Sequence, residues 1–208
     1  MKVILIHLEK MIGQMLIGFE GVSDYFLSKT KAERAAWDFM ESKGLKNKLT
    51  SINPGGVFGD ALDKKGGTSI EYVRQFMKGK FPGAPKFAVL ISDVKDIAKA
   101  HVACIGNNKV GGRRLIVGKE VKKLVELSQL MAEAMPEYAK KLPKKELPNF
   151  MVKLISYLDS SAKTMIPDLG IVMQTDTTYA EELLGFKFKP AKGAIVDAAK
   201  SVVRLGLV

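Results

Sequence analysis

Hydrophobic and polar positions follow two different periods along the chain, and the changes of period divide it into short strands and helices. Short runs of β-branched and other apolar residues predict strands, and apolar residues three or four positions apart predict helices. Strands are predicted at 1–6, 48–53, 86–91 and 113–117. Helices are predicted at 24–43, 69–78, 93–105, 121–135, 150–158, 176–184 and 192–205. Strands that alternate with helices predict an α/β fold with a mainly parallel sheet.

The ends of the first long helix are marked by residues that favour helix boundaries. Ser23 or Asp24 can cap its start, and Gly44 follows its last turn, where a left-handed residue is favoured. In the segment 121–135 the apolar residues fall on a single stripe, which predicts a face buried in the core. These residues are Leu124, Leu127, Leu130, Met131 and Met135.

The composition is that of a globular protein of one domain, with 208 residues, 47% hydrophobic and 26% charged. Cys104 is the only cysteine, which excludes a disulfide within the chain and fits a cytoplasmic setting. It is predicted to be a small buried residue on a helix. His7 and His101 are the only histidines, so no histidine-based metal site is expected.

The N-terminal segment begins with Met-Lys-Val-Ile-Leu-Ile, and a signal peptide is the alternative to a first strand. His7, Glu9 and Lys10 interrupt the apolar run early, and no small-residue cleavage site follows. No apolar run reaches the roughly 18 residues that a spanning helix needs. We therefore expect a cytoplasmic protein that has no membrane partner.

The chain is strongly basic, with a net charge of +11 and a pI of about 9.6. A nucleic-acid partner is one interpretation, and it requires DNA binding that weakens steeply with salt. The densest lysine cluster, at 140–145, has no interleaved aromatic residues that could stack on bases. We therefore favour a solvated basic surface without a nucleic-acid partner, whose field would also attract NADPH or an acidic substrate.

Tyr25 and Lys29 form a Tyr-x-x-x-Lys pair near the start of the predicted helix 24–43. Because they are four residues apart, their side chains lie on one helix face, one turn apart. A free phenol has a pKa of about 10, and a neighbouring ammonium lowers that pKa toward the range used in acid–base catalysis. In the structural alternative, Tyr25 is a half-buried surface aromatic and Lys29 pairs with Glu33.

Four segments, 25–37, 50–59, 92–102 and 176–190, carry a resemblance to a known family. They are similar to an active-site helix, the strand and Pro-Gly loop after it, an Asp-Val-x-Asp-(Ile/Val)-Ala-x-Ala-His segment, and a helix that runs into Leu-Gly-Phe. Their order and spacing resemble the extended short-chain dehydrogenase/reductase family. Within that family the chain is most similar to the dihydroflavonol-4-reductase-like branch (NAD-dependent epimerase/dehydratase), over residues 23–208.

The resemblance implies an oxidoreductase that reduces a small ketone or aldehyde with NADP or NAD as cofactor. Tyr25 would then donate a proton to the carbonyl oxygen, and Lys29 would lower the tyrosine pKa and bind the nicotinamide ribose. Pro54 and Val57 would lie against the nicotinamide, with Gly55 and Gly56 allowing close approach of the backbone. Weaker candidates for the rim of the substrate pocket are Phe58 and Ser69.

The family's nucleotide-binding start is not found in this sequence. That start is a strand followed by a Gly-x-x-Gly-x-x-Gly turn, which places the cofactor pyrophosphate on a helix N-terminus. Gly13, Gly18 and Gly21 do not have this spacing, and residues 1–22 contain no Ser or Thr that could bind the substrate carbonyl. We therefore expect the sequence to represent a C-terminal portion of the family fold, with activity impaired or lost in this chain.

The resulting architecture is a partial Rossmann-type sheet with a small C-terminal substrate-binding subdomain. Residues 1–22 form an atypical N-terminal segment, 23–120 the second half of a Rossmann-type domain, and 121–208 a mainly helical subdomain interleaved with it. A partial sheet leaves an edge and an apolar face for other segments to cover. The alternative function is therefore a non-catalytic folded remnant, or a binding module that oligomerises, with a homodimer as the expected assembly.

Overall fold

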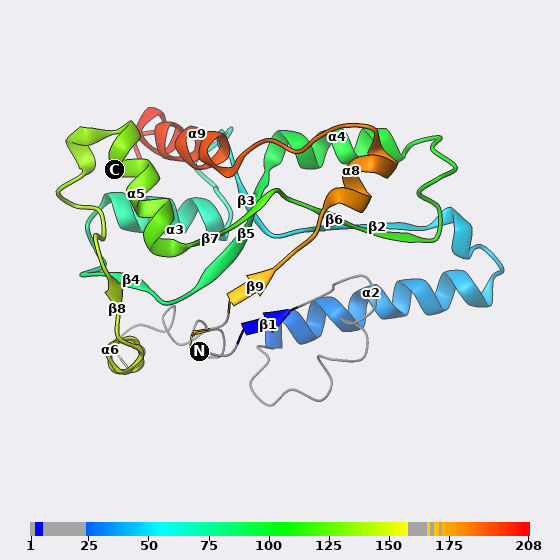
Figure 1. The fold of residues 1–208 in the computed structure, drawn as a ribbon, viewed down its shortest axis with the longest axis horizontal. Helices are drawn as coiled ribbons and strands as arrows, with labels where there is room; N and C mark the ends of the chain where they lie inside the picture. Colours follow the sequence, from blue (N-terminus) through cyan, green and yellow to red (C-terminus); the bar gives the residue numbers. More distant parts are fainter. Residues whose placement is uncertain (1–2, 6–23, 158–165, 167–168, 171) are drawn as a thin grey trace.

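A computed structural model describes residues 3–5, 24–157, 166, 169–170 and 172–208, and Figure 1 shows its ribbon. The strands are β1 Val3–Leu5, β2 Thr50–Pro54, β3 Gly56–Phe58, β4 Ala84–Pro85, β5 Ala88–Asp93, β6 Arg113–Val117, β7 Glu120–Lys123, β8 Glu146–Leu147 and β9 Val172–Gln174. The α-helices are α2 Asp24–Ser42, α3 Thr68–Met77, α4 Val94–Cys104, α5 Leu124–Ala134, α6 Asn149–Ile155, α8 Thr178–Leu184 and α9 Ala191–Arg204. Short 3-10 helices lie at Lys46–Lys48 and Pro136–Tyr138.

The strands pair mainly in parallel, which confirms the predicted α/β class. β2 pairs with β6, β3 with β5, β4 with β8 and β1 with β9, all in parallel. β7 is antiparallel to β5, with Leu90 opposite Val121. In Figure 1 helices α4, α8 and α9 lie on one side of these strands and α2 lies on the other. The arrangement is therefore layered, with helices on both sides of the strands.

Two apolar clusters form the core. The larger one joins β3 and β5 to helices α3, α5 and α9, and Met77, Ile195 and Val202 within it are fully buried. The smaller one lies between β6 and helices α4 and α8, with Leu115 and Ala180 among its members. Each cluster combines residues from both sides of position 120. The predicted division into interleaved subdomains, with its boundary at 120, stays a prediction.

The helix boundaries follow the capping chemistry of the sequence. Asp93 ends β5 and caps α4, since its carboxylate accepts a hydrogen bond from the Lys95 N–H at 2.7 Å. Gly44 and Gly185 follow α2 and α8 with φ of 69° and 75°, a left-handed conformation that favours glycine. The stripe predicted in segment 121–135 is the buried face of α5, although the helix begins only at Leu124.

Five short strands, β3, β4, β7, β8 and β9, are not predicted by the sequence because they are two to four residues long and lack a period of their own. β3 lies between the predicted strand 48–53 and the predicted helix 69–78, and β8 lies between the predicted helices 121–135 and 150–158. β7 occupies the first residues of the predicted helix 121–135, because its pairing with β5 outweighs the helical pattern. Tertiary pairing decides the structure of such short segments.

Helix α2 presents most of its length to solvent. Phe39 is 61% exposed, and Thr30 is the buried residue of the helix, at 6%. The alanines Ala32, Ala35 and Ala36 of this helix are exposed as well. Among the described residues no helix is long and apolar enough to cross a membrane.

Candidate active site

Tyr25 and Lys29 lie on the same face of the first turns of α2, as their spacing predicted. The Lys29 ammonium nitrogen is 5.5 Å from the centre of the Tyr25 ring, which is a cation–π distance. The Tyr25 ring also meets Phe26 edge to face, with ring centres 5.7 Å apart. Tyr25 is 65% exposed, so its hydroxyl is accessible to a small molecule.

Glu33 fastens α2 to the sheet. Its carboxylate receives two charged hydrogen bonds from Arg114 on β6, at 2.6 and 2.8 Å, and a third from the Trp37 indole at 3.1 Å. Burial raises the pKa of Glu33, but hydrogen bonds from Arg114, Ser51 and Trp37 outweigh it and hold that pKa below its usual range. Glu33 is therefore the partner of Arg114, and the Lys29–Glu33 pair of the structural alternative is not formed.

The end of β2 is held by Ser92 on β5. The Gly55 N–H donates to the Ser92 hydroxyl at 2.9 Å, and that hydroxyl donates to the Val117 carbonyl at 2.5 Å. Ser92 is fully buried, and its hydroxyl joins β2, β5 and β6 at one point. The sequence analysis did not identify this serine as important, because a single serine inside a strand has no distinguishing pattern.

Gly55 is required by the approach of the neighbouring strand. A Cβ at this position would lie 2.2 Å from the carbonyl oxygen of Leu90, which is closer than atoms can pack. From the family resemblance, Gly55 and Gly56 are expected to let the backbone approach the nicotinamide closely. In the structure, the backbone of β5 already excludes a side chain at Gly55.

Gly55→Ala is expected to destabilise the protein by about 2–3 kcal/mol, because β2 and β5 must separate to admit the methyl group. Gly193→Ala is the matched control, since a Cβ at that exposed position of α9 meets nothing within 4 Å. The control is expected to stabilise by about 0.5–1 kcal/mol through helix propensity. Urea unfolding of both variants measures the difference, and equal midpoints would contradict the packing argument.

The predicted pocket residues differ in exposure. Val57 is 37% exposed and lies opposite Ser92 in the β3–β5 pairing. Phe58 is 3% exposed and belongs to the larger core, so its side chain supports β3 from the core side. Ser69 lies in the first turn of α3 close to Gly56, where a Cβ would come within 3.5 Å of the serine hydroxyl. The structure thus brings Ser69 beside the Pro-Gly-Gly segment, and the pocket role of these residues stays a prediction.

The candidate site is in two parts. Among the described residues, no hydrogen bond or ion pair joins Tyr25 or Lys29 to the segment 54–58. The two parts are connected through the sheet, because Arg114 on β6 holds Glu33 while β6 pairs with β2. The predicted Gly13, Gly18 and Gly21 lie outside the described residues. The described residues also contain no group of three or more His, Cys, Asp or Glu that could hold a metal ion.

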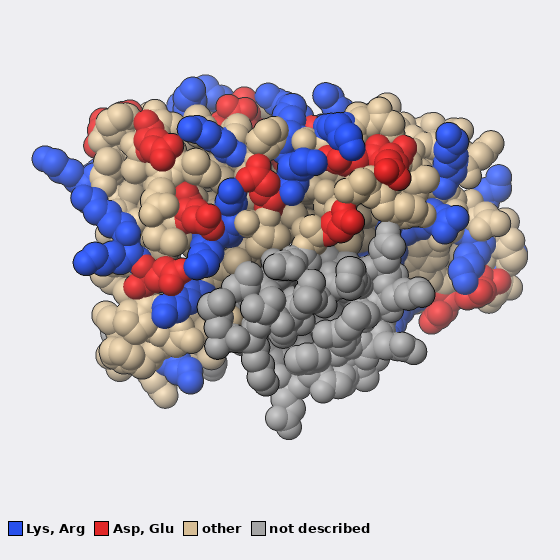
Figure 2. Space-filling view, viewed as in Figure 1, with Lys and Arg blue, Asp and Glu red and all other residues tan. Residues whose placement is uncertain are grey.

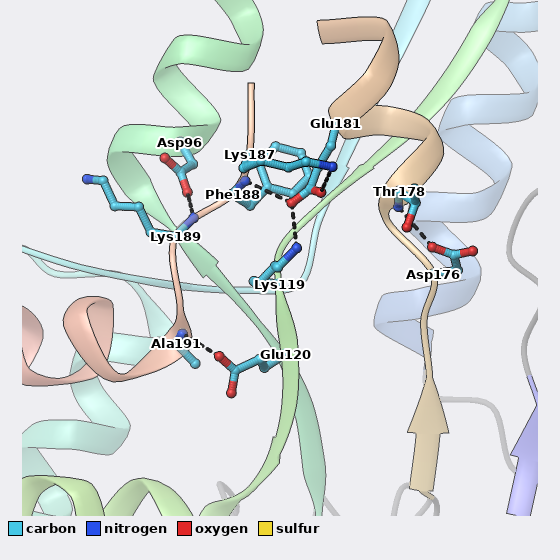
Figure 3. Close-up of polar contacts among 10 residues, drawn as sticks. All are labelled: Asp96, Lys119, Glu120, Asp176, Thr178, Glu181, Lys187, Phe188, Lys189 and Ala191. Atoms are coloured by element: carbon cyan, nitrogen blue, oxygen red, sulfur yellow. Dashed lines mark hydrogen bonds and ion pairs between the residues drawn. The ribbon is translucent and has the colours of Figure 1, made fainter. Parts of the chain in front are cut away.

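Three carboxylates hold the segment that leads into α9, and the sequence analysis did not identify them (Figure 3). Glu181 on α8 accepts from the Phe188 N–H at 2.9 Å, and Asp96 on α4 accepts from the Lys189 N–H at 2.7 Å. Glu120 on β7 accepts from the Ala191 N–H at 3.2 Å. We call Asp96, Glu120 and Glu181 the carboxylate clamp. It fixes the start of α9 against three different elements.

Glu120 and Glu181 are the clamp acids that also form ion pairs, and Glu181 is the more deeply buried of the two. Its carboxylate pairs with Lys119 at 2.7 Å and Lys187 at 3.0 Å, and 2% of its side chain is exposed. Burial raises the pKa of Glu181, but hydrogen bonds from Lys119, Phe188 N–H and Lys187 outweigh it and lower that pKa from 4.5 to about 2. The ionised form is therefore the one that stabilises the fold.

The stability supplied by Glu181 is expected to depend on pH in a defined direction. A depressed folded-state pKa gives stability that is fully present above the unfolded pKa of 4.5 and is lost as the pH falls toward about 2. The difference in unfolding free energy between wild type and Glu181→Gln should therefore be largest at neutral pH and shrink below pH 4.5. Urea titrations of both proteins measure it, and a difference that is constant with pH would contradict this account.

The far end of α9 is tied to the loop after β3. The Arg204 guanidinium donates to the Asp60 carboxylate at 2.7 Å and to the Ala61 carbonyl at 2.6 Å. Asp60 lies directly after Gly59, in the loop that follows β3. Helix α9 thus runs from the carboxylate clamp at its start to this loop at its end.

No model of a known protein family matches the chain. The chain is 30% identical over 194 residues to the NADPH-dependent methylglyoxal reductase of Saccharomyces cerevisiae. The aligned region covers 88% of this chain and 52% of that protein. The chain is 32% identical over 114 residues to tetraketide alpha-pyrone reductase 2 of Arabidopsis thaliana, with 55% of this chain and 35% of that protein covered. The crystal structure of yeast methylglyoxal/isovaleraldehyde reductase with NADPH superimposes with a TM-score of 0.64 at 28% identity. That likeness covers 86% of this chain and 54% of the yeast chain.

The chain is related to the extended short-chain dehydrogenase/reductases. This confirms the resemblance carried by the four sequence segments, and the Rossmann-like neighbours confirm the fold class. The chain spans about half the length of the curated relatives it matches. That share agrees with the predicted resemblance to a C-terminal portion of the family fold.

Proposed function

We propose that the chain takes part in NADPH-dependent reduction of a small ketone or aldehyde. The observation that supports this most strongly is the stacking of Lys29 on Tyr25 at the exposed start of α2, in a relative of NADPH-dependent reductases. Two residue types that can move a proton are thus held on one accessible face. The proposed substrates are small carbonyl compounds such as methylglyoxal, which the name of a relative specifies.

In the proposed reaction the Tyr25 hydroxyl donates its proton to the carbonyl oxygen of the substrate. Lys29 stabilises the phenolate that this leaves, and it holds the nicotinamide ribose by hydrogen bonding. NADPH supplies the hydride that the carbonyl carbon receives. Pro54, Gly55 and Val57 would flank the nicotinamide ring, with Val57 partly exposed at the strand end.

The described residues fit the nicotinamide end of the cofactor better than its phosphate end. Val57 presents an apolar side chain at the surface, and the backbone of Gly55 is fixed by Ser92. No described strand leads through a Gly-x-x-Gly-x-x-Gly turn into a helix. The phosphate-binding contribution therefore has to come from outside the described residues or from a second chain.

Calorimetric titration of the purified chain with NADPH, then with NADH, tests this proposal first. Saturable micromolar binding of NADPH, followed by carbonyl-dependent loss of its absorbance, is the expected result. Substrates named for relatives, methylglyoxal and isovaleraldehyde, are the first to assay. No binding at millimolar cofactor would reject the reductase proposal for this chain.

The second candidate is a non-catalytic module that forms a homodimer through its exposed α2 face. The 61% exposure of Phe39 on that helix is the observation that favours it. A mass that rises with protein concentration, together with no cofactor binding, would support this candidate. The cytoplasm is the proposed setting for both candidates, supported by the single unpaired thiol of Cys104.

A further inference from the structure

Helix α6 is apolar on both of its faces. Val152 faces inward and is 2% exposed, whereas Phe150, Leu154 and Tyr157 are 70%, 66% and 87% exposed. Phe150 and Leu154 are spaced i and i+4 on the face of α6 opposite Val152, and Tyr157 follows in the turn after the helix. In Figure 1 α6 lies at the lower left margin, away from the layered body of the molecule. We call Phe150, Leu154 and Tyr157 the α6 stripe.

Four lysines lie on α6 or on the strand segments that lead into it. Lys153 lies on the helix itself, and Lys144 and Lys145 directly precede β8, which leads through Pro148 into α6. Lys86 follows β4, whose Pro85 pairs with Leu147 of β8, so it belongs to the same corner. All four lysines are exposed, and none has an ion-pair partner among the residues described.

Among the described residues, Glu146 is the acid next to these lysines in the sequence. Glu146, the acid of β8, already faces Lys123 at 3.6 Å. Figure 2 shows the lower left lobe of the molecule as mainly uncharged surface, bordered by basic side chains and an acidic patch. An apolar stripe on a helix at the margin of the molecule, with unpaired lysines on the neighbouring segments, fits a helix that lies in a membrane interface.

We propose that the α6 stripe docks on an anionic lipid surface. Phe150 and Leu154 would enter the boundary between headgroups and acyl chains, with Tyr157 at headgroup depth, where its apolar ring and polar hydroxyl are both accommodated. Lys86, Lys144, Lys145 and Lys153 would contact the anionic headgroups. The helix would lie along the surface, which needs no spanning segment.

Charge decides between this partner and the other occupants. A second copy of the chain would bring the same four lysines against their equivalents, and like charges oppose that contact. A single-stranded nucleic acid would satisfy the lysines, but the aliphatic Leu154 at the centre of the stripe offers no ring for base stacking. An anionic bilayer satisfies both the apolar stripe and the lysines.

Sedimentation with vesicles tests the proposal, using phosphatidylcholine with and without about 30% phosphatidylserine. The wild-type chain is expected to bind the anionic vesicles at least about tenfold more tightly than the neutral ones. The triple variant Phe150→Ser, Leu154→Ser and Tyr157→Ser should lose this binding, as should Lys144→Glu with Lys145→Glu. All replaced residues are exposed, so circular dichroism and the melting temperature should remain unchanged.

The matched control is Val102→Ser with Ile105→Ser, which replaces one apolar residue of α4 and one directly after it that are 69% and 82% exposed. This control should sediment with anionic vesicles like the wild type. Equal binding to both vesicle types, equal loss in the control, or no binding at low salt would each overturn the proposal. A mass that falls to the monomer in the triple variant would assign the stripe to self-association instead, and tight RNA binding without lipid binding would assign it to nucleic acid. None of these measurements depends on reductase activity.

Discussion

Tyr25→Phe is expected to lower the rate of NADPH-dependent carbonyl reduction by about 10²-fold or more, while leaving the fold unchanged. The change removes one hydroxyl from a side chain that is 65% exposed, so no core packing is lost. The phenylalanine ring keeps the contacts with Lys29 and Phe26, but it has no proton to give to the carbonyl oxygen. A positioned general acid contributes roughly 10²–10⁴-fold to a rate, which sets the expected size.

The measurement is the steady-state rate of NADPH oxidation with a fixed carbonyl substrate, compared at equal NADPH saturation. Tyr157→Phe is the control, since it removes a hydroxyl from another exposed tyrosine that is 87% exposed. It should match the wild type in rate. Should Tyr25→Phe retain full activity with unchanged NADPH affinity, Tyr25 would not be the proton donor, and the site would have to be sought elsewhere.

Glu181→Ala is expected to lower the free energy of unfolding by about 2–3 kcal/mol. The substitution leaves the Phe188 N–H and two ammonium groups without their carboxylate, and it empties a buried position. Removing one partner of a fully buried pair typically costs about 3–5 kcal/mol. We expect a smaller loss because Lys119 and Lys187 are 37% and 72% exposed and can be hydrated instead.

Thermal unfolding at neutral pH checks this prediction, and the melting temperature should fall by roughly 5–10 °C for a chain of this size. Glu41→Ala is the matched control, because Glu41 and its partner Lys46 are 61% and 53% exposed. An exposed pair of this kind contributes at most about 1 kcal/mol. If both variants melted alike, the clamp would contribute no more than a surface ion pair.

The sequence predicted the elements whose patterns are local. The strand 113–117 and the helix 93–105 depend on neighbours in the chain, and the structure confirms both, as β6 Arg113–Val117 and α4 Val94–Cys104. The pair Tyr25 and Lys29 was also placed correctly on one helix face, because a spacing of four residues decides that alone. Such features need no knowledge of distant contacts.

The features that the sequence did not reveal depend on partners far apart in the chain. Ser92 joins Gly55 to Val117, and Asp96 meets Lys189 across 93 positions. The exposure of Phe39 on α2 depends on what covers the helix, which periodicity cannot describe. Asp96 lies in segment 92–102, and Glu181 and Lys189 lie in segment 176–190, both of which carry the family resemblance. The acids within these two segments are the signal that could have pointed to the carboxylate clamp.

The position of α9 constrains the order in which this protein can fold during synthesis. Its residues 191–202 form one wall of the larger core, against α3 and β3, which are made more than 100 residues earlier. Until α9 has left the ribosome, Phe58, Val73 and Met77 have no cover on that side. The nascent chain therefore exposes a large apolar surface for most of its translation, and we expect it to require chaperone protection until α9 closes the core.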